Sequence, residues 1–300
     1  MEHVINCEQF SRQELKELFD LVTVVKSNPK KYWKALEGKI ITTIFFEPST
    51  RTRLSFEAGI QRLGASVIST ENATAHSSAK KGETLEDTIK VLAGYSDAIV
   101  MRHSDDDSAQ RAMKVSKVPI INAGSGKAEH PTQSLLDAYT IYQHKNGLDN
   151  VKIAVLGDLK YGRTIHSLLS LLSKFENIEV YGLSKKEFEL PNEYIEMLRK
   201  KGIEYKICNG FGDIPKDVDV LYHTRIQSER FEGDFGKEEF IINKDVLDKF
   251  SANTIVMHPL PKNNEISDDI DSDPRAMYFE QAENGMWVRM ALLLKVLKYC

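Results

Sequence analysis

Cysteine is scarce in this chain, and long apolar runs are missing. Its three cysteines, Cys7, Cys208 and Cys300, are widely spaced and form no C-x-x-C pair. That spacing fits neither a disulfide framework nor a zinc site. No apolar stretch reaches about 18 residues, the length that suggests a membrane-spanning helix. Charged residues such as Glu2 and Glu8 interrupt the start, where a signal peptide would be apolar. We therefore expect a cytoplasmic protein without a membrane segment.

A large excess of charge of one sign is also missing. Lys and Arg together number 40 against 44 Asp and Glu, a net charge of −4. The chain therefore has no global basic field to attract nucleic acid, and any cluster of cations must be local. The length of 300 residues and the hydrophobic fraction of 41% are sufficient for about two ordinary cores.

Short β-rich runs alternate with amphipathic helical runs along the chain. Ser11 and Glu14 form a capping box ahead of apolar residues at helical spacing. Strands are expected at 40–46, 66–69, 98–101, 119–121 and 152–156 and near Val180, Tyr205, Val220 and Val256, with helices between them. This alternation predicts an α/β fold of two doubly wound domains, each a mostly parallel sheet flanked by helices.

A polar, turn-rich stretch at 145–150 separates the two halves of the pattern. We place one domain at 1–145 and the other at 146–285. The last helical run, 275–298, is expected to break at Gly285, and the part from 286 onward is apolar enough to pack on a large surface.

The segment 46–53 closes an apolar strand and opens a helix, which makes it a candidate anion site. Backbone N–H groups at a helix N-terminus lack internal partners and carry roughly half a positive charge, so they favour a phosphate. The neighbouring hydroxyls and the Arg51 guanidinium would complete the site. The Gly-rich stretch and Lys-Ser/Thr end of a Walker loop are missing, so the segment indicates a smaller phosphate ester or anhydride.

Arg51 and Arg53 are predicted to have different roles. Successive helical residues rotate by about 100°, so the two side chains point to different sides. We assign Arg51 to the anion and expect Arg53 to pair with Glu57 at i+4 spacing. A helix start that is merely capped by Ser49 or Thr50 is the alternative.

Other polar residues stand at the expected carboxyl ends of strands, where ligands bind in such sheets. They are Arg102, His130, Arg163, Arg225 and the loop 258–261. The alternatives are a surface pair of Arg102 with the acidic residues 105–107, a structural role for His130 and a helix-terminal surface position for Arg163. The stretch Gly157–Gly162 lacks the second glycine of a dinucleotide fingerprint, because Leu159 stands in its place.

Four motifs, Phe45–Arg53, Lys80–Thr84, His130–Gln133 and His258–Pro261, together resemble the aspartate carbamoyltransferase family. They occur in that family's order, and the resemblance extends over nearly all 300 residues. It implies transfer of the carbamoyl group of carbamoyl phosphate to the α-amine of L-aspartate, giving N-carbamoyl-L-aspartate and phosphate, an early step of de novo pyrimidine biosynthesis. It implies no metal or organic cofactor, and a C-terminal helix, 286–300, that packs back on the first domain.

The resemblance also implies a role for each site residue. The residues that bind carbamoyl phosphate would be Ser49, Thr50, Arg51, Thr52, Ser77, Arg102, His130, Gln133, Leu260 and Pro261. Those that bind aspartate would be Lys81, Arg163, Arg225, Gln227 and Leu260, and the catalytic ones Arg51, Thr52, Lys81, Arg102 and His130. Thr52, Arg102 and His130 would contact the carbonyl oxygen, Gln133 the carbamoyl amide, Arg163 the α-carboxylate, and Arg225 with Gln227 the β-carboxylate. Leu260–Pro261 would be a cis bond, and His258 is expected to be structural.

In this family a loop serine and lysine, here Ser77 and Lys81, enter the active site of the neighbouring subunit. The resemblance thus implies a homotrimer with shared active sites, and it leaves room for a regulatory chain as a further partner. Two alternatives stay open: a carbamoyltransferase for another amino acid such as ornithine, and a binding homologue without turnover. The cysteine usual in the corresponding loop of ornithine enzymes is absent from 258–261, which favours aspartate. Lys262 stands where the family usually has arginine.

Overall fold

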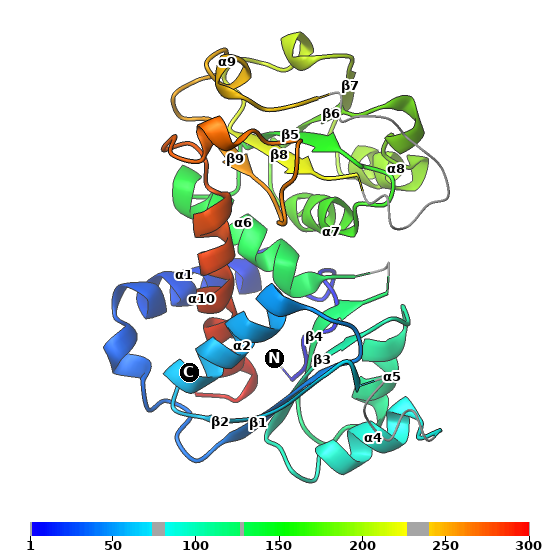
Figure 1. The fold of residues 1–300 in the computed structure, drawn as a ribbon, viewed down its shortest axis with the longest axis vertical. Helices are drawn as coiled ribbons and strands as arrows, with labels where there is room; N and C mark the ends of the chain where they lie inside the picture. Colours follow the sequence, from blue (N-terminus) through cyan, green and yellow to red (C-terminus); the bar gives the residue numbers. More distant parts are fainter. Residues whose placement is uncertain (1, 74–81, 127–128, 227–239, 300) are drawn as a thin grey trace. The chain divides into compact units, whose positions relative to one another are not determined.

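The computed structural model describes residues 2–73, 82–126, 129–226 and 240–299 of the chain (Figure 1). The chain forms two compact units, one of residues 1–136 and 283–300 and the other of residues 137–282. The chain passes between the units inside α6 (Pro131–Lys145) and inside α10 (Tyr278–Val296). Each unit contains one parallel sheet flanked by helices, so the predicted α/β class is confirmed.

The sheet of the first unit has four strands in the order β2-β1-β3-β4, all parallel. Their bounds are β1 Ile40–Phe45, β2 Ser66–Glu71, β3 Ala98–His103 and β4 Ile120–Ser125. The chain goes from β1 to one side for β2 and then returns to the other side of β1 for β3. The strand order therefore reverses between β1 and β3, and at such a reversal the loops diverge and leave room for a ligand.

Helices cover both faces of this sheet. They are α1 (Arg12–Ser27), α2 (Thr50–Arg62), α4 (Leu85–Leu92) and α5 (Ser108–Val115), with a 3-10 turn η1 (Pro29–Tyr32). Thr43 donates a hydrogen bond to Glu57 of α2 at 2.9 Å, whereas Ile44 packs with apolar residues of α4 and α5. Adjacent strand residues face opposite sides of a sheet, so α2 and the α4–α5 pair lie on opposite faces. The predicted capping box of α1 is confirmed, with Ser11 and Glu14 each accepting the other's backbone N–H.

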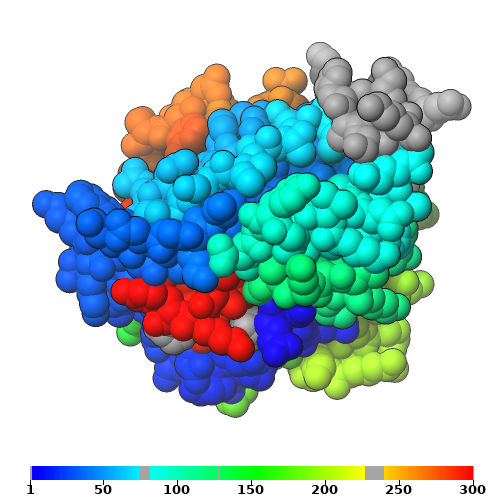
Figure 2. Space-filling model, turned by 90° about the horizontal axis from the view of Figure 1, so that it is seen from below, coloured from blue at the N-terminus to red at the C-terminus, as the bar shows by residue number. Residues whose placement is uncertain are grey.

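The end of the chain packs on the first unit, as the resemblance implied. Arg289 of α10 donates to the hydroxyl of Ser55 at 2.9 Å and lies over the ring of Phe56. Lys26 of α1 donates to the side chain of Asn284 at 2.9 Å. Figure 2 shows the red C-terminal residues beside the blue N-terminal ones. The part of α10 after residue 286 thus packs on α2, and the preceding Asn284 contacts α1.

The predicted break at Gly285 is wrong, because α10 runs without interruption from Tyr278 to Val296. A Cβ on Gly285 would lie 2.4 Å from Nη1 of Arg289 and 3.0 Å from Cδ2 of Leu136. The glycine therefore allows close packing between α10 and α6. A glycine inside a helix costs about 1 kcal/mol relative to alanine, which a long and well-packed helix can absorb.

The sheet of the second unit has five parallel strands in the order β7-β6-β5-β8-β9. Their bounds are β5 Lys152–Gly157, β6 Glu179–Leu183, β7 Tyr205–Cys208, β8 Val220–Thr224 and β9 Ile255–Met257. Here the order reverses between β5 and β8. The central strands β5 and β8 are almost fully buried, as expected for a parallel sheet covered on both faces.

The remaining helices belong to this second unit. They are α7 (Arg163–Leu172), α8 (Asn192–Lys200) and α9 (Lys244–Leu247), with 3-10 turns η3 (Lys186–Phe188), η4 (Phe211–Asp213) and η6 (Asp268–Ile270). In Figure 1, α7 and α8 lie on the side of the sheet away from α9. One core cluster joins Leu156, Leu183 and Leu221 of the sheet to Leu247 of α9 and Ile270 of η6.

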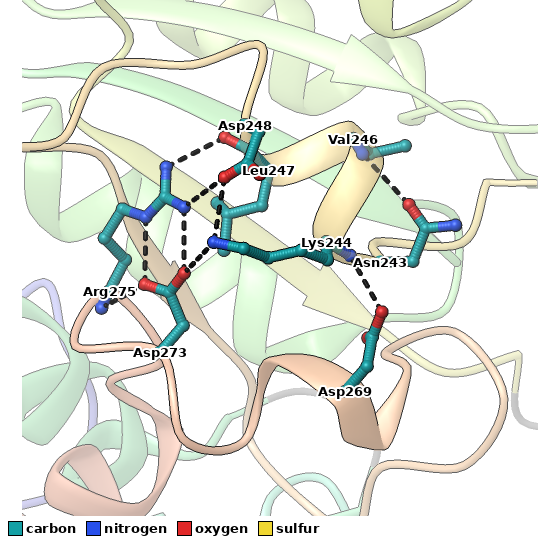
Figure 3. A network of polar contacts seen from close by, with 8 residues as sticks. All are labelled: Asn243, Lys244, Val246, Leu247, Asp248, Asp269, Asp273 and Arg275. Carbon is teal, nitrogen blue, oxygen red and sulfur yellow. Dashed lines mark hydrogen bonds and ion pairs between the residues drawn. The ribbon is translucent and has the colours of Figure 1, made fainter.

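A polar network ties α9 to the segment that follows η6 (Figure 3). Arg275 donates to Asp273 at 2.9 and 2.8 Å and to Asp248 at 2.9 Å. Lys244 lies 2.9 Å from Asp248 and 3.0 Å from Asp273. The hydrogen bonds from Arg275 hold the pKa of Asp273 well below its usual range. The chain between β9 and α10 is therefore fixed at its far end by charge-assisted bonds.

Candidate functional site

The predicted anion loop joins β1 to α2 in the first unit. Ser49 occupies the N-cap position of α2, yet among the described residues its side chain caps no backbone N–H of the helix. Its hydroxyl instead lies 3.3 Å from Nη1 of Arg102, the residue before the last of β3, which pairs with β1. Ser49 thus takes the cap position that the alternative reading gave it, but its hydroxyl contacts a cation on the neighbouring strand.

The two arginines of this loop differ as the helical rotation predicted. Arg51 is exposed, Thr52 is buried and Arg53 is partly buried. Arg53 lies 3.2 Å from the carboxylate of Glu57, the predicted partner, and 3.1 Å from that of Glu71. Arg53 thus contacts two carboxylates within the fold, while Arg51 is exposed at the start of α2.

Glu71 was not identified from the sequence. It ends β2, and its carboxylate accepts the backbone N–H of Ser49 at 3.1 Å while it pairs with Arg53. It therefore holds the anion loop from the side opposite Arg102. No local pattern marks this residue, because its partners lie about 20 positions away in the sequence and meet it only through the pairing of β1 with β2.

Arg102 lies at the carboxyl end of β3, next to the anion loop. Its backbone carbonyl accepts the N–H of Phe46 at 2.9 Å, and its Nε lies 3.5 Å from the carboxylate of Glu47. Of the acidic residues 105–107 considered as alternative partners, Asp105 and Asp107 lie 3.4 and 3.6 Å from Arg111. The structure thus brings Arg102 and Ser49 together, as expected for a shared anion site.

His130 immediately precedes α6 and is buried, with 5% of its surface exposed. Ser125, the last residue of β4, exchanges backbone hydrogen bonds with Glu129, and this places His130 next to the end of that strand. Gln133, one turn into α6, is partly buried. The anion loop, Arg102 and His130 therefore lie at the carboxyl ends of β1, β3 and β4, which are neighbours in the sheet.

In the second unit, the ends of β5 and β8 are tied together. The hydroxyl of Thr224 donates to the carbonyls of Leu156 and Asp158 at 3.2 and 3.3 Å. Gly157 has a φ of +92°, and a Cβ there would lie 2.0 Å from the carbonyl oxygen of Thr224. Only glycine fits this approach, so the first glycine of the stretch 157–162 serves strand packing.

Arg163 and Arg225 follow these two neighbouring strands. Arg163 is the first residue of α7 and has 8% of its surface exposed. Arg225 follows β8, is partly buried, and has Nη1 3.5 Å from the carbonyl of Ile226. Two guanidinium groups beyond adjacent strands of one sheet can each take a carboxylate through two parallel hydrogen bonds, which is what a dicarboxylate requires.

The loop after β9 adopts the geometry that the resemblance implied. Leu260–Pro261 is a cis peptide bond, and Leu260 has a φ of +55°. His258 is buried and contacts the equally buried Glu265, so its predicted structural role agrees with its surroundings. Lys262, the departure from the usual arginine, contacts the carboxylates of Asp268 and Asp271.

Three predicted residues, Ser77, Lys81 and Gln227, lie outside the described residues. Leu159, which stands in place of the second glycine of a dinucleotide fingerprint, is fully buried. Within the described ranges, no group of three or more His, Cys, Asp or Glu could hold a metal ion, and no helix is long and apolar enough to cross a membrane. A cavity of about 690 Å³ lies beyond β6 and β7 in the second unit, and the predicted site residues are not among those lining it.

Comparison with known proteins assigns both halves of the chain to one family. Residues 2–143 match "Aspartate/ornithine carbamoyltransferase, carbamoyl-P binding domain", and residues 149–296 match "Aspartate/ornithine carbamoyltransferase, Asp/Orn binding domain". The aspartate carbamoyltransferase catalytic subunit of Clostridium novyi is 49% identical over 98% of this chain and 97% of its own length.

Solved structures agree with this assignment. The catalytic subunit of M. jannaschii aspartate transcarbamoylase has a TM-score of 0.92 and 45% identity, over 99% of this chain and 98% of that one. Aspartate transcarbamoylase from Trypanosoma cruzi, solved with carbamoyl aspartate and phosphate, has a TM-score of 0.90 and 40% identity, over 98% of this chain and 95% of that one.

Proposed function

Since this chain belongs to the aspartate/ornithine carbamoyltransferase family, we propose that it transfers the carbamoyl group of carbamoyl phosphate to the α-amine of L-aspartate. The observation that carries the proposal is the similarity along nearly the whole chain to relatives named for aspartate. The two arginines that follow β5 and β8 support it, because aspartate brings two carboxylates and ornithine only one.

The first unit holds carbamoyl phosphate. Its phosphate lies at the N-terminus of α2 against Ser49, Thr50, Arg51 and Thr52, where the positive end of the helix and a guanidinium favour an anion. Arg102 adds a second cation, and its contact with Ser49 supports its place beside the same ligand. Gln133 and the backbone of Leu260 and Pro261 receive the carbamoyl amide.

The reaction forms one C–N bond and breaks one C–O bond. The α-amine attacks the carbamoyl carbon, and negative charge develops on the carbonyl oxygen against Thr52, Arg102 and His130. As the tetrahedral intermediate collapses, the electron pair of the C–O bond leaves with phosphate, which accepts the amine proton. Preorganised donors of this kind are worth about 3 to 4 kcal/mol each when measured by deletion. No metal or organic cofactor takes part.

Aspartate binds to the second unit. Arg163 takes its α-carboxylate, and Arg225 with Gln227 takes its β-carboxylate. Ser77 and Lys81 come from the neighbouring subunit of a homotrimer, so that each active site is shared. Clustered cations offset the repulsion between two substrates that each carry about two negative charges.

The proposal is tested by supplying carbamoyl phosphate with a panel of amino acids and measuring ureido product and phosphate. Phosphate release that requires aspartate and yields carbamoyl aspartate is the expected result. Turnover with ornithine instead would assign a different amine, and binding of carbamoyl phosphate without any product would assign a binding homologue. Mass measurement of the native protein, alone and with candidate regulatory chains, tests the homotrimer, and cell fractionation tests the cytoplasmic location.

A further inference from the structure

The backbone of Leu260 is held in an unfavourable conformation by a buried side chain. With a φ of +55°, Leu260 lies in the left-handed region, which a residue with a Cβ rarely adopts. Its N–H donates to Nδ1 of His258 at 2.8 Å. That hydrogen bond restrains the residue whose carbonyl would receive the carbamoyl amide, so its partner is a candidate for controlling the geometry of the ligand.

The hydrogen bond fixes the protonation of His258. Because Nδ1 accepts from Leu260, the proton of a neutral ring must be on Nε2. Nε2 lies 2.9 Å from the carboxylate of Glu265, and only 1% and 3% of the two side chains are exposed. Glu265 also accepts the N–H of Asn263 at 3.0 Å. Burial alone would raise the pKa of Glu265, but the nearby His258 ring and the N–H of Asn263 hold that pKa at about 2, so the ring faces a carboxylate anion.

A second set of buried contacts anchors the backbone of His258. Its N–H donates to the side-chain oxygen of Gln281 in α10 at 2.9 Å. The amide of Gln281 donates to Asp137 of α6 at 2.6 Å, and the hydroxyl of Tyr222 in β8 donates to the other oxygen of Asp137 at 2.7 Å. All four residues have at most 1% of their surface exposed. The chain at the end of β9 is thus bound to α10, and through it to α6 and β8.

We propose that His258 is a positioning residue, which Glu265 orients so that its Nδ1 fixes Leu260 with the backbone carbonyl toward the carbamoyl amide. The inference rests on the proposed function for the identity of the ligand, but its geometric part concerns this chain alone. The two ring nitrogens of His258 then have different roles. Nδ1 acts on the ligand through Leu260, and Nε2 contributes to stability through its 2.9 Å contact with the buried carboxylate of Glu265.

Two substitutions of His258 separate the role of Nδ1 from the role of Nε2. In His258→Asn, the side-chain oxygen lies near the position of Nδ1 and can still accept from the N–H of Leu260, while the contact with Glu265 is lost. In His258→Gln, the amide nitrogen reaches the place of Nε2 and can still donate to Glu265, while Leu260 loses its acceptor. The same two substitutions at His144, an exposed histidine of the same unit, serve as controls.

We expect one variant to lose mainly stability and the other to lose mainly activity. His258→Asn lowers the melting temperature but keeps kcat/KM for carbamoyl phosphate within about threefold of the unmodified chain. His258→Gln loses less stability, yet its kcat/KM falls by about tenfold to a hundredfold, and the Leu260 amide exchanges with solvent about tenfold faster or more. A merely structural histidine would instead give activity losses that follow the stability losses in both variants, and this outcome would overturn the inference.

Amide exchange separates failure of the inference from failure of the proposed function. If the unmodified chain makes no carbamoyl aspartate but Leu260 is still protected in His258→Asn and not in His258→Gln, the positioning stands and the proposed function falls. If the enzyme is active and the two variants exchange alike at Leu260, the positioning role is wrong. Should His258→Asn fail to fold, the double variant His258→Asn, Glu265→Gln removes the unpaired buried charge and repeats the comparison.

Discussion

Replacing Arg53 by alanine should lower stability, whereas the same change two residues earlier should remove activity. Arg53 contacts Glu57 at 3.2 Å and Glu71 at 3.1 Å, and the three side chains are 22%, 19% and 33% exposed. Exposed ion pairs contribute about 0 to 1 kcal/mol, and breaking a buried pair costs about 3 to 5 kcal/mol. These partly buried pairs lie between the limits, so we expect Arg53→Ala to lose about 2 kcal/mol in all.

That loss corresponds to a fall in melting temperature of about 4 to 8 °C for a unit of this size. Arg51 is exposed, so Arg51→Ala should change the unfolding free energy by about 0.5 kcal/mol or less while removing measurable turnover. Thermal unfolding and carbamoyl aspartate formation are measured on both variants, with Arg53→Lys as a control that keeps one charge. Equal losses of activity in two stably folded variants would refute the rotation argument, and a destabilised Arg51→Ala with normal turnover would reverse the assignment.

Three further predictions concern the other parts of the site. Arg225→Ala should lower kcat/KM for aspartate by an amount that corresponds to about 2 to 4 kcal/mol of lost transition-state binding, and it should leave the affinity for carbamoyl phosphate nearly unchanged. Arg225→Lys is the control that keeps the charge but not the two parallel hydrogen-bond donors. The opposite pattern in steady-state kinetics would exchange the two half-sites. Arg51→Ala and Lys81→Ala chains, refolded together, should regain roughly a quarter of full activity, because about three quarters of the trimers are mixed and one site in three of those is intact. Verified mixed trimers without activity would place Lys81 in the site of its own chain or outside the site. The pKa of Glu265 is lowered from 4.5 to about 2, so this residue should contribute about 3 kcal/mol to the free energy of unfolding above pH 4.5, and this contribution should be lost as the pH falls toward 2. Glu265→Gln should therefore make the stability depend less on pH in the acid range. An unchanged pH dependence there would show that His258 does not hold the carboxylate in solution.

Local patterns predicted most of the elements because their causes are local. The capping box at Ser11 and the alternation of β-rich and helical runs depend on residues a few positions apart, and the strands and helices appear where those patterns place them. The anion loop belongs to the same class, since the first N–H groups of a helix have no partner within the helix and favour an anion. The separate directions of Arg51 and Arg53 follow from helix geometry alone.

Gly285 shows where local reasoning failed. A glycine in a helical run is ordinarily a weak point, so the sequence indicated a break. The structure keeps the helix, because the missing Cβ lets Arg289 and Leu136 approach closely. Leu136 lies about 150 positions earlier, and no pattern around Gly285 shows that such a neighbour exists.

The sequence by itself determined the elements, the residue types able to bind two anionic substrates, and their places at strand ends. Only the tertiary structure decided which strand ends are neighbours: the order β2-β1-β3-β4 places Arg102 against Ser49, and the order β7-β6-β5-β8-β9 places Arg163 and Arg225 beyond adjacent strands. It also decided which buried or partly buried carboxylates contact the site residues: Glu71 accepts the N–H of Ser49 in the anion loop, and Glu265 contacts His258. The physical reason is range, since helix starts and strand patterns arise from neighbours in the chain, whereas strand order and buried partners arise from packing between segments far apart in it.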